Sequence, residues 1–124
     1  AIGMCLTGGF ALGAIINEKV KAAVLCQPSY PFATKIHTLG FSGPQIKCIK
    51  ERAEAEQGTL AKGYRYAGDF ISRESHMKAA ENMLGERFER YPDLPGREHS
   101  TLTSDSFSQA VYDDCLAFLG EKLG

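Results

Sequence analysis

The chain has no tryptophan, no apolar run of membrane-spanning length, and a net charge of only −1. A transmembrane helix needs roughly 18 or more consecutive apolar residues, so no membrane partner is expected. Binding to a polyanion normally requires clustered Lys and Arg, so no nucleic-acid partner is expected either. What remains, with 44% hydrophobic and 23% charged residues, is the composition of an ordinary globular domain.

The four cysteines, at positions 5, 26, 48 and 115, form no CxxC pair. That spacing is typical of zinc sites and of thioredoxin-like redox motifs. The three histidines are scattered and distant from the cysteines, so the sequence predicts no metal and no other cofactor. Cys26 and Cys48 lie in apolar stretches and Cys115 lies on an apolar helix face, where cysteine serves as a small buried hydrophobe. We therefore expect a reduced, cytoplasmic protein.

The first half of the chain alternates between helix-like and strand-like patterns. Residues 7–16 are apolar nearly all round, which predicts a buried helix. The short apolar run 20–26 predicts a strand covered on both faces. Ser42 stands three residues before a glutamine, and this capping-box spacing predicts a helix closed by Gly58. Residues 60–67 predict a second strand.

The second half continues the alternation. Ser72 is expected to cap a helix that ends near Leu84, and residues 87–91 to form a short polar edge strand. Ser104 is expected to open a last, amphipathic helix. Alternation of this kind predicts an α/β fold in which helices flank a mostly parallel sheet.

The sharpest motif is the segment GMCLTGG around Cys5. A sharp turn from strand to helix leaves its central side chain accessible. Because strand and helix approach closely there, the neighbouring residues must be small, here Gly3 and Thr7. The helix N-terminus behind Cys5 lowers a thiol pKa, and the Leu6 backbone N–H helps to bind an oxyanion. The alternative interpretations are a glycine-rich turn with a buried cysteine and a loose phosphate loop, although the glycine spacing is not that of a dinucleotide fingerprint.

Two further residues are candidates for chemistry. Asp69 follows a predicted strand, at the edge where open α/β sheets place their ligands; alternatively, it caps a helix or turn. His99 lies in a loop before the last helix and is alternatively a solvated residue. Their order, Cys5…Asp69…His99, is the order of nucleophile, acid and histidine in α/β-hydrolases.

On these residues the chain resembles the dienelactone hydrolase family, α/β-hydrolases with a cysteine nucleophile. GMCLTGG resembles the family's cysteine elbow, AGDFIS its acid loop and EHSTLT its histidine segment. The resemblance implies hydrolysis of small-molecule esters or lactones through an acyl-enzyme. Cys5 would attack the carbonyl, His99 would carry the proton and Asp69 would orient the imidazole.

The resemblance covers residues 1–124 but only the C-terminal part of the family's domain, beginning at the elbow. We expect the chain to be a fragment, with little or no activity alone, because the family's second oxyanion donor and its thiol-activating carboxylate come from the earlier part. The family usually has glycine where Thr7 stands. An alternative function is an inactive half-fold that binds a partner or self-associates through the sheet edge left by missing strands. A third is a redox-sensing thiol protein.

Other side chains near these motifs are assigned lesser roles. Arg73 lies close to the acid loop and could contact an anionic substrate. His76 is expected on the surface, and His37 in a long loop that could overhang the site. The aromatic residues Tyr30, Phe32 and Phe41 are expected to cover the sheet rather than to line a pocket.

Overall fold

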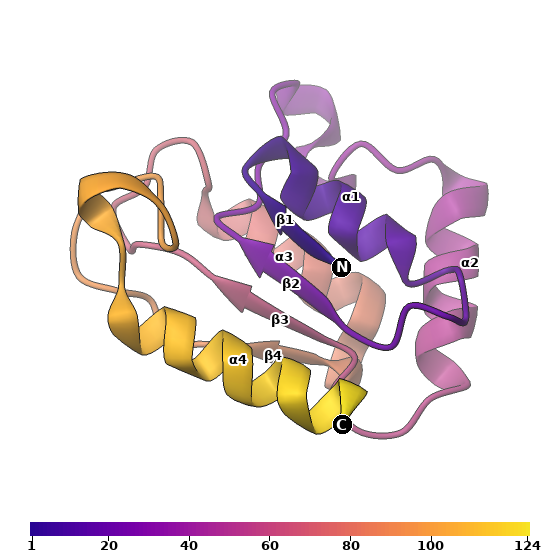
Figure 1. Cartoon of the computed structure of the whole chain (residues 1–124). Coiled ribbons are helices and arrows are strands. Elements are labelled where there is room, and N and C mark those ends of the chain that lie inside the picture. The colour runs from indigo at the N-terminus through magenta and orange to yellow at the C-terminus, as the bar shows by residue number, and fades with distance from the viewer.

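The computed structural model describes residues 1–124, with every side chain except that of Ser104. Four strands, four α-helices and three short 3₁₀ helices follow one another along these residues (Figure 1). None of the described helices is both long enough and apolar enough to cross a membrane. The elements are β1 (Ile2–Met4), α1 (Leu6–Ala14), β2 (Ala23–Cys26), a 3₁₀ helix (Ala33–Thr38), α2 (Gly43–Glu54), β3 (Ala61–Tyr64), α3 (Glu74–Leu84), a 3₁₀ helix (Gly85–Arg87), β4 (Phe88–Arg90), a 3₁₀ helix (Ser104–Ser106) and α4 (Gln109–Leu123).

The four strands form one parallel sheet in the order β1-β2-β3-β4. The register aligns Gly3 with Leu25 and Leu25 with Gly63. Parallel neighbours require a crossover connection, usually a helix, and helices α1, α2 and α3 lie in these connections. The α/β class with a parallel sheet, predicted from the alternating pattern, is confirmed.

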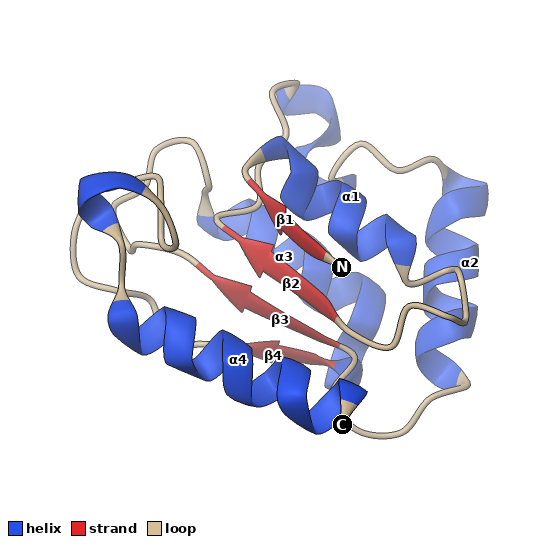
Figure 2. Ribbon diagram, viewed as in Figure 1, coloured by secondary structure: helices blue, strands red, loops and turns tan.

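Alternate side chains of β2 point into two separate cores. Ala23 and Leu25 join the core under α1, α2 and α3, whereas Val24 and Cys26 join the core under α4. Figure 2 shows the strands between these two layers of helices. Because successive residues of a strand face opposite sides, a strand covered on both sides is apolar throughout, as the sequence indicated.

Several predicted boundaries are confirmed. The capping box at Ser42 is present, with the hydroxyl accepting from the Gln45 N–H and the Gln45 side chain accepting from the Ser42 N–H. Helix α3 ends at Leu84, followed by Gly85 at a φ of 54°. The short edge strand predicted for residues 87–91 is β4.

Two predicted helix starts were wrong. Helix α4 begins after Ser108, whose hydroxyl accepts from the Val111 N–H, and residues around Ser104 form a 3₁₀ turn instead. Ser72 does not cap α3; its hydroxyl donates to the Pro28 carbonyl across the sheet edge, at 2.7 Å. Ser72 has several possible backbone partners, and tertiary packing determines which of them it takes.

Two predictions of burial were also wrong. Helix α1 is not buried all round, since Phe10 is 63% exposed while Leu12 is fully buried. Cys48 is exposed on α2, because its neighbour Ile49 takes the inward position. Cys26 and Cys115 are buried as expected.

Helix α4 covers one side of the core that contains Val24 and Cys26. Substitutions on this helix therefore test its placement against the sheet. Phe118 is 4% exposed and Leu116, on the same helix, is 52% exposed. We expect Phe118→Ala to lower the free energy of unfolding by about 3–5 kcal/mol, because it removes a buried aromatic ring. The control Leu116→Ala should change it by about 0.5 kcal/mol or less. Urea unfolding measures both, and equal losses would contradict the placement of α4.

Candidate active site

The carboxyl ends of the parallel strands bring distant residues to one edge of the sheet. Cys5 follows β1, Ser29 lies three residues after β2, and Asp69 follows β3 by five residues. In Figure 1 the strand arrowheads point toward the side where the orange loop before α4, which carries His99, also lies. Ligands of open α/β sheets bind at this edge.

Cys5 occupies a strained turn between β1 and α1. Its φ is 56° and its ψ is −124°, a conformation that non-glycine residues rarely adopt and that costs about 1–3 kcal/mol. Gly3 makes the turn possible, since a Cβ there would lie 1.9 Å from the Thr7 carbonyl oxygen. Strand and helix therefore approach as closely as the sharp turn predicted from the sequence requires.

Thr7 stands where the family resemblance would place glycine, and its side chain holds the turn together. The hydroxyl accepts from the Met4 N–H at 2.8 Å and donates to the Met4 carbonyl at 2.6 Å. These two backbone groups lie at the edge of β1 that faces away from β2. A glycine at this position would lack both hydrogen bonds.

Asp69 is 4% exposed, and its carboxylate is fully engaged. One oxygen accepts from the backbone N–H groups of Ile71 and Ser72, at 2.8 and 2.9 Å. The other oxygen lies 2.6 Å from Nδ1 of His99. The backbone contacts hold the carboxylate in one orientation, and this orientation selects the ring position of His99.

The loop that carries His99 is anchored to the neighbouring strand ends. Oε1 of Gln27, just after β2, accepts from both the N–H and the hydroxyl of Thr101, at 3.2 and 3.0 Å. Downstream, the Tyr66 hydroxyl donates to the carbonyl of Ser106 at 2.6 Å. The histidine therefore belongs to a loop tied to the ends of β2 and β3.

Cys5 and His99 each shift the pKa of the other side chain. Burial alone raises the pKa of the Cys5 thiol, but Ser29, His99 and the Leu6 backbone N–H outweigh it, and the pKa is lowered. Burial alone lowers the pKa of the His99 imidazole, yet Cys5 and Asp69 reverse this, and the pKa is raised. Both shifts favour the thiolate–imidazolium pair.

The thiol has a second neighbour that the sequence did not suggest. Sγ of Cys5 lies 3.0 Å from Oγ of Ser29, and the Ser29 N–H donates to the Cys5 carbonyl. Nε2 of His99 is buried and has no hydrogen-bond partner among the described atoms. The ring nitrogen that would take a proton from a nucleophile is therefore not committed to a hydrogen bond with another group.

A pocket of about 370 Å³ opens beside Cys5. Leu6 and Arg73, both predicted near the site, line it, together with Tyr30, Phe70 and His76. Arg73 is exposed, and its Nε donates to the Phe70 carbonyl at 3.1 Å. The lining is mostly apolar, with one cationic side chain at its border, a composition typical of small-molecule sites.

Two expectations about neighbouring side chains were wrong. His76 is not on the surface but 1% exposed. Its Nδ1 accepts from the Arg73 N–H at 2.9 Å, and its Nε2 lies 3.0 Å from the Tyr30 nitrogen, so the ring bridges two walls of the pocket. Tyr30, expected only to cover the sheet, lines the pocket as well. His37 is exposed on the 3₁₀ helix and does not line this pocket.

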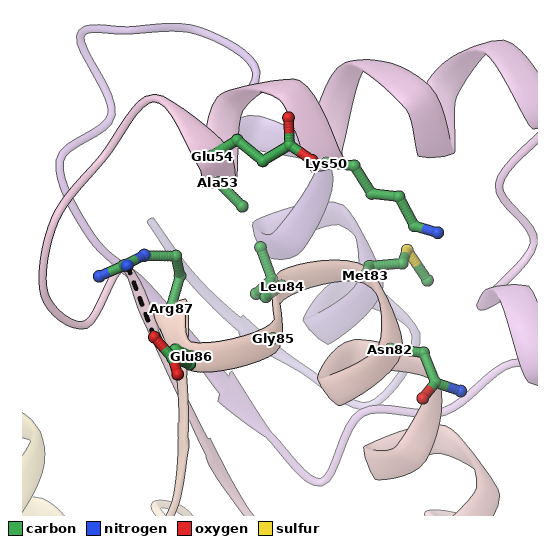
Figure 3. A pocket seen from close by; sticks show the side chains of 9 residues that line it. All are labelled: Lys50, Ala53, Glu54, Asn82, Met83, Leu84, Gly85, Glu86 and Arg87. Atoms are coloured by element: carbon green, nitrogen blue, oxygen red, sulfur yellow. Dashed lines mark ion pairs between the residues drawn. The ribbon is translucent and has the colours of Figure 1, made fainter.

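A cavity of similar size lies elsewhere and lacks this chemistry. It measures about 360 Å³ and lies between α2, which contributes Lys50, Ala53 and Glu54, and residues 82–87 (Figure 3). Its drawn ion pair, Arg87 with Glu86 at 3.9 Å, joins two neighbouring residues of the chain. Within the described residues, no group of three or more His, Cys, Asp or Glu side chains is arranged to hold a metal ion.

Comparisons of the chain with protein-family models, with curated proteins and with solved structures find no match.

Sequence reasoning placed Cys5, Asp69 and His99 at the sheet edge but missed three polar residues that support them. Ser29, Gln27 and Arg65 are all at most 5% exposed. Each follows the end of a strand of the sheet, a position where a polar residue either meets solvent or serves a site. A polar residue just after a strand could have indicated a role at the site. The sequence does not show which hydrogen-bond partner each of these side chains takes.

The lowered thiol pKa predicts how Cys5 reacts with an alkylating agent. Because the thiolate is the nucleophile, alkylation by iodoacetamide should persist as the pH falls below about 8.5, the ordinary thiol pKa, and should decline only below the lowered value. His99→Ala removes the stabilising imidazole and should move this decline to higher pH. Peptide mass spectrometry at each pH measures the rate at Cys5; identical profiles for the two proteins would contradict the pairing.

Proposed function

We propose that the chain is the C-terminal part of an α/β-hydrolase domain, similar to dienelactone hydrolases, and that it hydrolyses esters or lactones through Cys5. The observation that carries the proposal is the arrangement of three side chains. Cys5 stands on a strained turn, His99 is close enough to shift the pKa of its thiol and has no hydrogen bond at Nε2, and Asp69 is 2.6 Å from the other ring nitrogen. This is the arrangement that nucleophile, base and orienting acid require.

The order of the parallel strands adds support. Nucleophile, acid and histidine follow β1, β3 and β4, in the chain order of α/β-hydrolases. The strained conformation at Cys5 is typical of a nucleophile held above the sheet. A glycine-rich turn with a merely buried cysteine has no need of the Asp69–His99 pair.

In the first half of the reaction, Nε2 of His99 takes the thiol proton and Sγ of Cys5 attacks the carbonyl carbon. The carbonyl electrons move to oxygen, and the Leu6 N–H at the start of α1 stabilises this oxyanion. Collapse of the intermediate breaks the bond to the leaving alkoxide, which takes the proton from Nε2. A thioester on Cys5 remains.

In the second half, His99 acts as a base toward water. The resulting hydroxide attacks the thioester carbonyl, and the bond from carbon to Sγ breaks. The acid product leaves, and the proton held on Nε2 returns to the thiolate. Asp69 stabilises the imidazolium in both halves through the contact to Nδ1.

The pocket suggests which substrates fit. Its apolar surface comes from Leu6, Ile36, Phe70 and Ile71, and Arg73 lies at the border. A small ester or lactone with an apolar body would fill this space, and an anionic group on it would meet the Arg73 guanidinium.

Acyl transfer from p-nitrophenyl acetate tests the proposal. We expect an acetyl group on Cys5, found by peptide mass spectrometry, and none there in Cys5→Ala. His99→Ala should slow acylation by about 10²–10⁴-fold, the usual contribution of a general base. Cys48→Ser, which removes an exposed thiol distant in sequence from the site, is the matched control and should leave acylation unchanged.

Equal acetylation of Cys5 and Cys48, or a rate that does not depend on His99, would contradict the proposal. Steady-state turnover is expected to be low or absent, because the Leu6 N–H is one donor of a site that normally has two. A missing donor costs about 10²–10³ in kcat. Sustained turnover by the 124-residue chain would show this last expectation to be wrong.

The alternative, a non-catalytic module that self-associates, is favoured by one observation. The Cys5 N–H donates to the Cys26 carbonyl and the Ala1 carbonyl accepts from Val24. The intervening residue Ile2 therefore directs its backbone groups to the other edge of β1, and its side chain is 57% exposed. Such an edge can pair with a second copy of the chain.

Self-association predicts a concentration-dependent dimer in analytical ultracentrifugation. Ile2→Lys should dissociate it, because a lysine on an edge strand opposes pairing. Leu123→Lys, at a residue 68% exposed on α4, is the matched control and should not. A monomer at all concentrations would exclude this alternative.

A further inference from the structure

Arg65 is a buried arginine at the sheet edge that the proposed reaction does not use. It is the first residue after β3 and is 5% exposed. Its Nε donates to the Ser72 carbonyl at 2.9 Å, and its Nη2 donates to the Ala67 carbonyl at 3.1 Å. These two carbonyls bracket Asp69, so one guanidinium spans the loop that presents the carboxylate.

The same guanidinium reaches the segment that leads to His99. Nη1 of Arg65 lies 2.6 Å from a carboxylate oxygen of Asp93, six residues before the histidine. The backbone reinforces this contact, since the Leu94 N–H donates to the Arg65 carbonyl at 3.0 Å. Two further hydrogen bonds, Ala67 N–H to Leu94 and Gly68 N–H to Gly96, both at 2.8 Å, join the two loops.

We propose that Arg65 is a positioning residue that holds the loop of Asp69 and the loop of His99 in one arrangement. Its role in turnover rests on the proposed function, whereas its role in joining Asp69 to His99 does not. Among the described residues, no hydrogen bond joins Arg65 to the His99 imidazole or to the Cys5 thiol. It acts through the backbone on both sides of Asp69 and through Asp93.

The chemistry of the contacts requires arginine. The guanidinium uses three nitrogens in a planar fork, toward two carbonyls and toward the carboxylates of Asp93 and Glu74. A lysine ammonium carries the same charge at one point and cannot reach all of these acceptors from one position. A lysine at this position therefore keeps the positive charge but loses the planar arrangement of donors that reaches these acceptors.

A neighbouring arginine provides a close control. Arg90 pairs with the carboxylates of Glu74 and Asp93, as Arg65 does, but no contact joins it to the carbonyls of Ala67 or Ser72. Arg52 on α2 is a second control, because it is 8% exposed and pairs with Glu56, just beyond the end of the same helix. Comparing variants of the three arginines distinguishes the effect of the hydrogen bonds on either side of Asp69 from a general effect of a buried cation.

The test measures the pKa of His99 by NMR titration of its ring, assigned by comparison with His99→Gln. Asp69 raises this pKa, so a loosened contact must lower it. We expect Arg65→Lys to lower it by about 0.5–1 unit, threefold to tenfold in the protonation equilibrium. Asp69→Asn should shift it in the same direction. Arg90→Lys should give a smaller shift, and Arg52→Lys none.

An unchanged His99 pKa in a folded Arg65→Lys protein would overturn the inference, as would an equal shift in Arg52→Lys. Should Arg65→Lys fail to fold, Asp93→Asn decides, because it weakens the contact to the histidine loop and leaves the arginine in place. A lowered His99 pKa in Asp93→Asn supports the inference, and an unchanged one overturns it.

The alkylation rate of Cys5 separates this inference from the proposed function. If Arg65 positions the pair, the pH at which alkylation declines rises in Arg65→Lys, as it does in His99→Ala. When these shifts occur but p-nitrophenyl acetate does not acylate Cys5, the hydrolase proposal fails and the role of Arg65 stands. When Cys5 is acylated and neither His99 pKa nor alkylation responds to Arg65→Lys, the inference about Arg65 fails alone.

Discussion

The backbone conformation at Cys5 is the constraint on which the site depends. A φ of 56° directs the chain from β1 into α1 without an intervening loop, and only a glycine at position 3 leaves room for the Thr7 carbonyl behind it. The strain costs about 1–3 kcal/mol and is opposed by the Thr7 hydroxyl, which bonds both backbone groups of Met4. A thiol on this turn faces the carboxyl edge of the sheet and the N-terminus of a helix at once.

The other half of the site depends on loops that lack regular structure but are densely hydrogen-bonded. Asp69 is oriented by two backbone N–H groups, His99 is oriented by Asp69, and Thr101 is held by Gln27. Buried polar groups are costly unless they are paired, so each such contact makes one loop arrangement strongly preferred. A site built this way is preorganised by its own hydrogen bonds.

The charged groups around the buried Arg65 are paired in the same way. Arg65, Arg90, Glu74 and Asp93 form one cluster in which the Arg90 guanidinium holds the pKa of the Glu74 carboxyl below its usual range. Buried ion pairs add little net stability, but removing one partner is strongly destabilising. Their value here is specificity, because the cluster joins the ends of β3 and β4 to the start of α3.

The sequence by itself determined the α/β alternation, the apolar strand β2, the strand β3, the capping box at Ser42 and the candidates Cys5, Asp69 and His99. These follow from local periodicity, turn chemistry and chain order, which neighbouring residues carry. The tertiary structure alone decided that His76 is buried, that Ser72 bonds Pro28 rather than capping α3, and that Arg65 brackets Asp69. The physical reason is that a polar side chain at a strand end has several possible partners, and only the packed loops bring one of them within hydrogen-bond distance.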